Sequence, residues 1–407
     1  MHPKNLSIND FFYELPDYKI ARFPLKNRDE SKLLFYKNKQ ISDHQFLELP
    51  EIISNNSLLV FNNTKVIHAR LLFQKKTGAT IEIFCLEPAD KSAREAFNST
   101  LNCTWKCLVG NAKRWKREIL QKEIIYKEKK IQLNAIFMDQ TDDYVIIQFS
   151  WNNDSINFGE LLQQSGLLPL PPYLNRTANK DDESSYQTVF AKEQGSVAAP
   201  TAGLHFTTRL TKQLQQKNIS SAELTLHVGA GTFKPVKSLL MEGHQMHRES
   251  IYVNLNTLEK IFDALVNNQP IIPVGTTSLR TLESVYWHGV KLLSGVQSAP
   301  QMDLHQWEAY QLPDHFLPVD AFKAIMENLK KNRMDELTGF TSILIAPGYK
   351  FKIADVLITN FHQPNSTLLL LVAAFVGADW EKIYTHALTN SYRFLSFGDS
   401  SILFKNQ

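Results

Sequence analysis

Cysteine and long apolar runs are both scarce in this sequence, and each scarcity excludes a class of protein. The chain has 407 residues but only three cysteines, Cys85, Cys103 and Cys107, with no CxxC pair. This odd set argues against a disulfide framework or a zinc ribbon and favours a reducing, cytoplasmic setting. The run from Leu368 to Val376 is far too short to cross a bilayer and predicts a buried helix. The N-terminus lacks the apolar core of a secretion signal, so no membrane association is expected.

A strong excess of one charge is also missing. Lys and Arg total 44 against 41 Asp and Glu, a net charge of +3 that decides nothing by itself. Its distribution is uneven, because residues 106–130 hold nine basic and three acidic side chains, interleaved with Trp115 and Tyr126. A basic face with aromatic side chains can hold an RNA backbone. A solvated lysine-rich face is the more common meaning of such a run.

The hydrophobic pattern changes character along the chain. Short alternating segments between about Arg70 and Trp151 predict a small antiparallel sheet or barrel. The rest alternates strand, short loop and helix, with strands expected at 222–228, 270–274 and 355–359. A polar or glycine-rich cluster follows each of these strands, where α/β folds collect their binding sites. We therefore expect an α/β main domain of residues 1–65 and 156–407, with a β-rich domain of residues 66–155 inserted.

Glycine is absent where a dinucleotide cradle would require it. The stretch LHVGAGTF, residues 226–233, has two glycines, but Lys234 stands where the fingerprint needs the third. A tight turn and an active-site loop remain as interpretations. The stretch SVAAPTAGLHF, residues 196–206, is similarly poor in bulky side chains and ends near a histidine. Loops of this kind let the backbone approach a ligand closely.

The stretch VGTTSLRTLES, residues 274–284, predicts a strand that enters a helix through a turn rich in hydroxyl groups. Free N–H groups and the helix dipole favour an anion at such a start. Arg280 could pair with a carboxylate or a phosphate from one turn inside the helix. Glu283 lies three residues further along on the same face, so an ordinary cap with an Arg280–Glu283 surface pair is the alternative.

Five histidines lie in or beside these loops: His205, His227, His244, His247 and His362. His244 and His247 could suggest a metal pair, but zinc needs three or four ligands and no further set has matching spacing. No metal is therefore expected. Acid–base chemistry or a structural hydrogen bond is the better interpretation of these histidines.

Taken in order, the motifs of the chain resemble those of one enzyme family. The matching stretches are RDESKLL (28–34), LLVFNNTKVIHARL (58–71), PLPPYLNR (169–176), YQTVFA (186–191), SVAAPTAGLHFT (196–207), LTLHVGAGTFKPV (224–236), HQMH (244–247), VGTTSLRTLES (274–284), APGYKF (346–351), LITNFHQPNSTLLLLVAAFVG (357–377) and YRFLSFGD (392–399). The chain resembles the S-adenosylmethionine:tRNA ribosyltransferase-isomerase family of queuosine biosynthesis over almost its whole length.

The resemblance implies an α/β, barrel-like main domain with a small, antiparallel, barrel-like β-domain inserted. It also implies transfer and rearrangement of the ribosyl part of S-adenosylmethionine onto 7-aminomethyl-7-deazaguanine at the wobble position of tRNA. The products would be epoxyqueuosine, adenine and methionine. S-adenosylmethionine would be a co-substrate, the tRNA anticodon stem-loop the partner, and no resident cofactor or oligomer would be required.

The reaction implied by the resemblance needs a general base, and a proton donor for the departing adenine. His205 and His227 are the candidates, because each adjoins a loop of small residues. Glu283 is counted with them, since it or Asp355 would face the sulfonium or the amine. The remaining expected contacts are Thr276, Thr277, Ser278 and Arg280 for the methionine carboxylate, Tyr186, Phe206 and Phe233 for stacking, and His362 for substrate binding.

Four positions depart from the usual family pattern. Asn63, Lys65, His68 and Ser185 stand where Asp, Arg, Pro and Arg are common, and the stretch 287–337 is unusually long. These departures leave a paralogue with a different RNA or base substrate as one alternative. A methyltransferase that uses the same co-substrate and a non-catalytic RNA-binding protein are the others.

Overall fold

The computed structural model describes residues 2–229, 236 and 238–406. The larger sheet of the main domain has six strands in the order β15-β3-β13-β14-β17-β16. The strands are β15 (Ile271–Pro273), β3 (Leu58–Asn62), β13 (Ser220–Leu226), β14 (Glu249–Asn254), β17 (Glu336–Thr341) and β16 (Met302–Leu304). β15 and β13 run parallel to β3, whereas β14 is antiparallel to both of its neighbours. Every residue of β3 is buried, as expected for a strand covered on both faces.

A four-stranded sheet continues this layer. Its order is β18-β19-β1-β2, formed by β18 (Val356–Asn360), β19 (Ser400–Phe404), β1 (Lys32–Lys37) and β2 (Gln40–Gln45). A parallel bridge from Val274 to Ile358 joins the two sheets beside β15. No strand pairing among the described residues closes the joined sheets into a ring. The expected α/β class is confirmed, and the main domain is an open layer in this structure.

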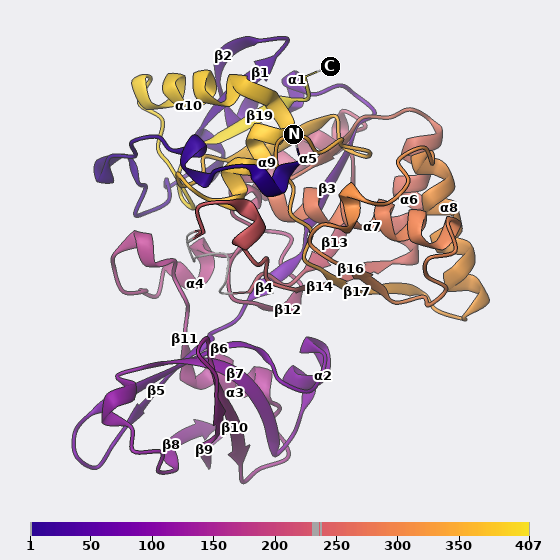
Figure 1. Ribbon diagram of the computed structural model, residues 1–407. Coiled ribbons are helices and arrows are strands. Elements are labelled where there is room, and N and C mark those ends of the chain that lie inside the picture. The colour runs from indigo at the N-terminus through magenta and orange to yellow at the C-terminus, as the bar shows by residue number, and fades with distance from the viewer. Residues whose placement is uncertain (1, 230–235, 237, 407) are drawn as a thin grey trace.

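The helices cover the faces of this layer (Figure 1). They are α1 (Leu49–Ile52), α5 (Thr208–Gln216), α6 (Leu255–Val266), α7 (Thr276–Leu293), α8 (Pro318–Lys331), α9 (Thr367–Val376) and α10 (Trp380–Thr389). α7 is buried from Ser278 to Lys291 and packs on α8, where a Cβ at Gly289 would lie 2.4 Å from the carbonyl oxygen of Ala321. Ser366 caps α9 by accepting a hydrogen bond from the N–H of Leu369. These elements confirm the strand, loop and helix alternation expected from the sequence.

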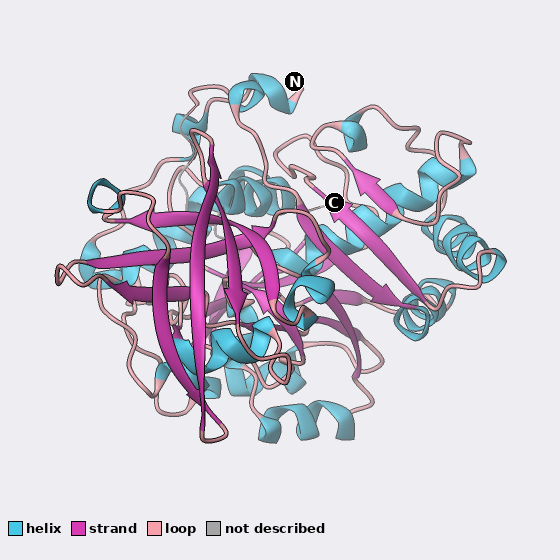
Figure 2. Cartoon of the chain, turned by 90° about the horizontal axis from the view of Figure 1, so that it is seen from below, coloured by secondary structure: helices cyan, strands magenta, loops and turns pink. Residues whose placement is uncertain are grey.

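The inserted region is a single curled antiparallel sheet of seven strands (Figure 2). Its order is β11 (Gly166–Leu167), β5 (Arg70–Gln74), β6 (Thr80–Pro88), β7 (Asn102–Gly110), β10 (Val145–Trp151), β9 (Lys129–Gln140) and β8 (Leu120–Tyr126). Alternate residues of these strands face a separate apolar core, which contains the three cysteines as free, buried thiols. Burial raises the pKa of the Cys103 and Cys107 thiols, so they are unreactive structural side chains.

The packing of the inserted region extends past residue 155. α3 (Phe158–Ser165) contributes Phe158, Leu161 and Leu162 to the same apolar core. β11 then pairs with β5, so the packed unit reaches Leu167. α2 (Ala93–Asn98) covers one side of the sheet, while β4 (Thr64–Val66) and β12 (Glu193–Ser196) form a two-stranded link to the main domain.

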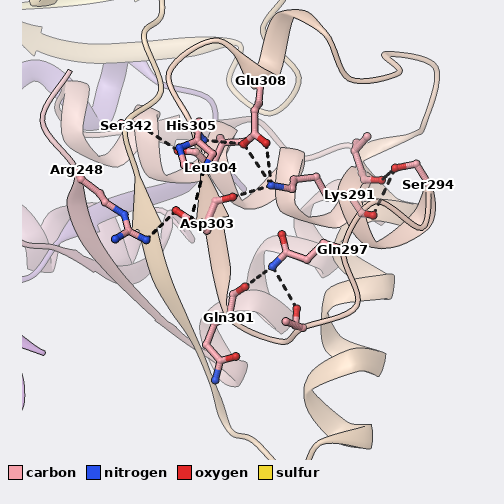
Figure 3. A network of polar contacts seen from close by, with 12 residues as sticks. Arg248, Lys291, Ser294, Gln297, Gln301, Asp303, Leu304, His305, Glu308 and Ser342 are labelled. Carbon is pink, nitrogen blue, oxygen red and sulfur yellow. Dashed lines mark hydrogen bonds and ion pairs between the residues drawn. The ribbon is translucent and has the colours of Figure 1, made fainter. Parts of the chain in front are cut away.

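The long segment 287–337 builds the outer edge of the main domain. It contains the end of α7, all of β16 and α8, and the start of β17. Ion pairs hold this segment in place: Lys291 of α7 pairs with Glu308, and Arg248 pairs with Asp303 (Figure 3). Among the described residues, no helix combines the length and the apolar character needed to cross a membrane.

Candidate active site

A pocket lies where β13, β15 and β18 end. Its walls come from the start of α7, the loop that follows β18, the residues 198–202 and the first residue of β14. Parallel strands place their carboxyl ends at one edge of a sheet, which brings these loops together from distant parts of the chain. The pocket therefore brings together residues that follow β15 and β18, with Val228 from the residues that follow β13.

The start of α7 forms one wall of the pocket. Gly275 precedes the helix with a φ of 91°, a conformation that other residues rarely adopt. Thr276 and Thr277 line the pocket and present first-turn N–H groups to it. Ser278 is fully buried and donates its hydroxyl hydrogen bond back to the carbonyl of Val274, so it does not line the pocket. Two of the three expected hydroxyl residues therefore reach the site.

Arg280 lies one turn into α7 and also lines the pocket. Its Nη1 donates to the carboxylate of Glu249 at the start of β14, and the two residues are 7% and 4% exposed. The alternative of an Arg280–Glu283 surface pair is therefore wrong. Nε and Nη2 of Arg280 are buried without a hydrogen-bond partner among the described residues, and so is Oγ1 of Thr277. Leaving a buried donor unsatisfied costs about 1–3 kcal/mol, so these donors are suited to a ligand.

Glu283 and Asp355 lie away from the pocket. The buried carboxylate of Glu283 accepts hydrogen bonds from Tyr349 Oη (2.8 Å) and from the backbone N–H groups of Lys352 and Ile353 (3.0 Å each). Burial raises the pKa of Glu283, while these donors oppose the shift. Asp355 precedes β18 at the end opposite the pocket and binds Lys405 at 2.9 Å. The expectation that either carboxylate would face the reacting atoms is corrected by these positions.

Of the three histidines assigned to the site, His362 lines the pocket. Its Nε2 lies 3.0 Å from Oγ1 of Thr359, and its backbone N–H donates to Tyr384 Oη. Burial lowers the pKa of His362 to about 3. The imidazole is therefore neutral near pH 7.

His205 lies behind the pocket rather than in its wall. Its Nδ1 is 2.7 Å from Ser31 Oγ and its Nε2 is 3.2 Å from Asn360 Oδ1. Because Asn360 Nδ2 donates to the carbonyl of Leu395, Oδ1 is the acceptor and Nε2 of His205 carries the proton. Asn360 itself lines the pocket. Burial lowers the pKa of His205 to about 4, so it orients Asn360 as a neutral donor.

His227 is half-buried beside the pocket wall. Its Nδ1 lies 2.9 Å from Thr64 Oγ1, and a Cβ at Gly195 would come within 2.6 Å of the imidazole ring. Burial, followed by the charge of Arg94, lowers the pKa of His227 to about 4. The next residue, Val228, lines the pocket. The glycine loop that follows, including Phe233, lies outside the described residues.

The two remaining aromatic candidates have different positions. Tyr186 lines the pocket, although its ring is otherwise enclosed, and burial raises its pKa. Phe206 does not line this pocket, because it is fully buried against Phe46, Phe61 and Phe190. The expected stacking role of Phe206 is therefore corrected to one in the core.

Several pocket residues were missed by the sequence analysis. They are Glu249, Tyr173, Asn360, Gln363 and Ser396. Asn360 and Gln363 belong to a loop that the sequence did mark, whereas Glu249 begins a strand and resembles an ordinary polar strand residue. Only its hydrogen bond with Arg280 distinguishes it.

The four departures from the family pattern lie outside the pocket wall. Asn63 accepts a hydrogen bond from Thr225 at 2.7 Å, Lys65 is in β4, and His68 contacts the carbonyl of Gln163. Ser185 lines a smaller cavity that also contains His205. Among the described residues, no group of three or more His, Cys, Asp and Glu side chains is arranged to hold a metal ion.

A pocket with unsatisfied buried donors at the carboxyl ends of strands is typical of α/β enzymes and is suited to an anionic small molecule. Comparison with known proteins makes the class specific. The model of the family described as queuosine biosynthesis protein matches residues 8–403, and this chain belongs to that family.

Relatives of the same length carry a single name, S-adenosylmethionine:tRNA ribosyltransferase-isomerase. The chain is 36% identical to the protein of Aromatoleum aromaticum over 98% of both chains. It is 37% identical to that of Thermotoga petrophila, over 98% of this chain and all of the relative. A crystal structure of S-adenosylmethionine tRNA ribosyltransferase from Thermotoga maritima matches 97% of this chain and all of its own, at 28% identity and a TM-score of 0.47.

Proposed function

We propose that this protein transfers and isomerises the ribosyl moiety of S-adenosylmethionine onto 7-aminomethyl-7-deazaguanine at the wobble position of a tRNA. The products are epoxyqueuosine in the tRNA, free adenine and free methionine. Full-length relatives with the corresponding name support this function. The observation in the molecule that carries it is Arg280, which lines the pocket and whose Nε and Nη2 are buried without a partner among the described residues.

The methionine carboxylate is the anion for which this pocket is best suited. Nε and Nη2 form one edge of the guanidinium and can grip a carboxylate with two parallel hydrogen bonds. Thr276 and Thr277, in the first turn of α7, line the same pocket, and the Thr277 hydroxyl has no partner among the described residues. We therefore assign Thr276, Thr277 and Arg280 to the carboxylate and Tyr186 to a ring of the substrate.

Proton transfer is assigned to the histidine that lines the pocket. The positive sulfonium acidifies the adjacent C5′ protons and leaves as a neutral thioether, so the base must present an unprotonated imidazole in the pocket. His362 is the candidate because it lines the pocket and its imidazole is neutral near pH 7. His205 acts as a positioning residue through Asn360. His227 remains a candidate donor to the departing adenine, since the loop after it adjoins the pocket at Val228.

The substrate also indicates where the protein works. A tRNA anticodon stem-loop is the proposed partner, which implies the cytoplasm, and one chain carries the whole pocket, so a monomer suffices. S-adenosylmethionine is consumed as a co-substrate, and the proposed reaction requires no resident cofactor.

The deciding experiment uses tRNA that carries 7-aminomethyl-7-deazaguanine, mixed with the purified protein and S-adenosylmethionine. Free adenine and the mass of the wobble nucleoside are followed together. Adenine release with the mass gain of epoxyqueuosine supports the proposal. S-adenosylhomocysteine with a methylated base would instead indicate a methyltransferase, and tight tRNA binding without turnover would indicate an RNA-binding protein.

A further inference from the structure

Glu249 is the one acidic side chain among the described residues that line the pocket. It is 4% exposed and begins β14, directly opposite the start of α7. One carboxylate oxygen accepts a hydrogen bond from Arg280 Nη1. The other oxygen has no hydrogen bond or ion pair with a described residue, so half of this buried carboxylate is available to a ligand.

Arg280 divides its donors between two directions. Nη1 serves Glu249, while Nε and Nη2, which form the opposite edge of the guanidinium, have no partner among the described residues. A carboxylate that takes the free edge therefore lies next to Glu249 without displacing it. Glu249 and Arg280 thus present an acceptor and a pair of donors side by side.

The charge balance of this arrangement selects the ligand. Glu249 and Arg280 neutralise one another in the unliganded pocket. A ligand that brought only a carboxylate would place two anions around one guanidinium in a buried site, which is unfavourable. A ligand that brought an ammonium as well would restore neutrality and satisfy the second oxygen of Glu249. The pair is therefore complementary to an α-amino acid zwitterion.

We propose that Glu249 binds the α-ammonium group of the methionine moiety of S-adenosylmethionine, while Arg280 binds its α-carboxylate. This inference rests on the proposed function, because it concerns the same pocket and the same co-substrate. It makes Glu249 the residue that distinguishes S-adenosylmethionine from analogues without the amine.

The test measures the binding of three ligands to the wild-type protein and to one variant. The ligands are S-adenosylmethionine, its decarboxylated form, which keeps the ammonium, and its 2-deamino analogue, which keeps the carboxylate. Affinities are measured by titration calorimetry on the full chain and on Glu249→Gln. We expect Glu249→Gln to bind S-adenosylmethionine and the decarboxylated form about tenfold or more weakly, because each loses a charge-assisted hydrogen bond. The 2-deamino analogue should bind the variant at least as well as it binds the wild type, because the variant removes one of the two carboxylates around Arg280.

Glu308→Gln is the matched control. Glu308 pairs with Lys291, about three turns further along α7, so the variant removes a carboxylate from a cation of the same helix outside the pocket (Figure 3). All three affinities should be unchanged in this variant. Glu249→Asp covers the case in which Glu249→Gln does not fold. It keeps the charge beside Arg280 but withdraws the carboxylate, so it should weaken the two amine-bearing ligands alone.

Two results would overturn the inference. If Glu249→Gln weakens the 2-deamino analogue as much as S-adenosylmethionine, Glu249 only positions Arg280. If wild-type protein binds S-adenosylmethionine and the 2-deamino analogue equally, the amine is not recognised at all. Both results leave the proposed function intact, since adenine release from S-adenosylmethionine would still occur. Absence of any S-adenosylmethionine binding to the wild type would overturn the proposed function and this inference together.

Discussion

At the scale of single residues, the guanidinium of Arg280 makes the sharpest prediction for activity. Lysine keeps the positive charge but replaces the two-donor edge by a point charge. We expect Arg280→Lys to raise the KM for S-adenosylmethionine by about tenfold to 100-fold, with a smaller change in kcat, because lysine cannot make the charge-assisted bidentate hydrogen bonds. Arg22→Lys, at an exposed pair with Asp17, is the control that should leave both constants unchanged. An unaltered KM in folded Arg280→Lys would remove Arg280 from the carboxylate site.

The buried histidines make a prediction about stability and pH. Burial holds the pKa of His205 at about 4, below its unfolded value of roughly 6.5. Such a group stabilises the fold fully above about pH 6.5, and the contribution is lost as the pH falls towards 4, because the unfolded chain then binds protons that the folded chain excludes. We expect His205→Gln to make the free energy of unfolding less dependent on pH between 6.5 and 4, by about 1.4 kcal/mol per pH unit.

Urea unfolding at several pH values measures this slope. His315→Gln, which changes an exposed imidazole, should leave it as in the wild type. A His205→Gln slope that also matches the wild type would show that folding does not lower the pKa of His205. In that case burial would not be what keeps His205 a neutral donor to Asn360.

At the scale of elements, Glu283 connects α7 to the segment 349–354. Its carboxylate accepts hydrogen bonds from Tyr349, Lys352 and Ile353 through both oxygens, and glutamine would keep only one of these acceptors and place an NH2 donor at the other. We expect Glu283→Gln to lower the free energy of unfolding by about 1–3 kcal/mol for each buried donor left unsatisfied. Thermal unfolding measures the effect. A large fall in kcat without a loss of stability would instead restore the catalytic role expected from the sequence.

The sequence predicted elements better than it predicted the packing between them. The spacing of apolar residues and the capping residues predicted the positions of β13, β15, β18, α7 and α9, because both signals are local in the sequence. The pocket loops were located because each follows a buried strand. The sequence analysis did not identify Glu249 as the partner of Arg280. Glu249 is 31 residues away along the chain, and its hydrogen bond depends on how β14 packs beside α7.

The histidines illustrate the same limit. A loop of small residues marks close packing but does not say what packs there. At His205 the near neighbours are Ser31 and Asn360, and at Gly195 the neighbour is the ring of His227. Side-chain direction decides between a pocket wall and a buried network, and only the fold fixes it.

At the scale of the whole molecule, the basic stretch lies at one edge of the inserted domain. β8 is the last strand of the seven-stranded sheet, and the segment before it contains four exposed cations without an ion pair to a described residue: Lys113, Arg114, Lys116 and Arg117. Exposed Ile119 and Ile125 lie close by along the chain. Charges beside an edge strand can serve to prevent aggregation, and they can also hold an RNA backbone.

Substituting these four cations by glutamine separates the two roles. If they hold the tRNA, its affinity should fall and the slope of log affinity against log salt should become shallower by roughly 0.7–0.9 for each phosphate that the variant no longer neutralises. Binding of S-adenosylmethionine should not change, because the pocket lies in the main domain. Filter binding at several salt concentrations measures the slope. An unchanged slope, together with aggregation of the variant, would mean that the four charges prevent aggregation through the edge strand. The tRNA would then bind on another face.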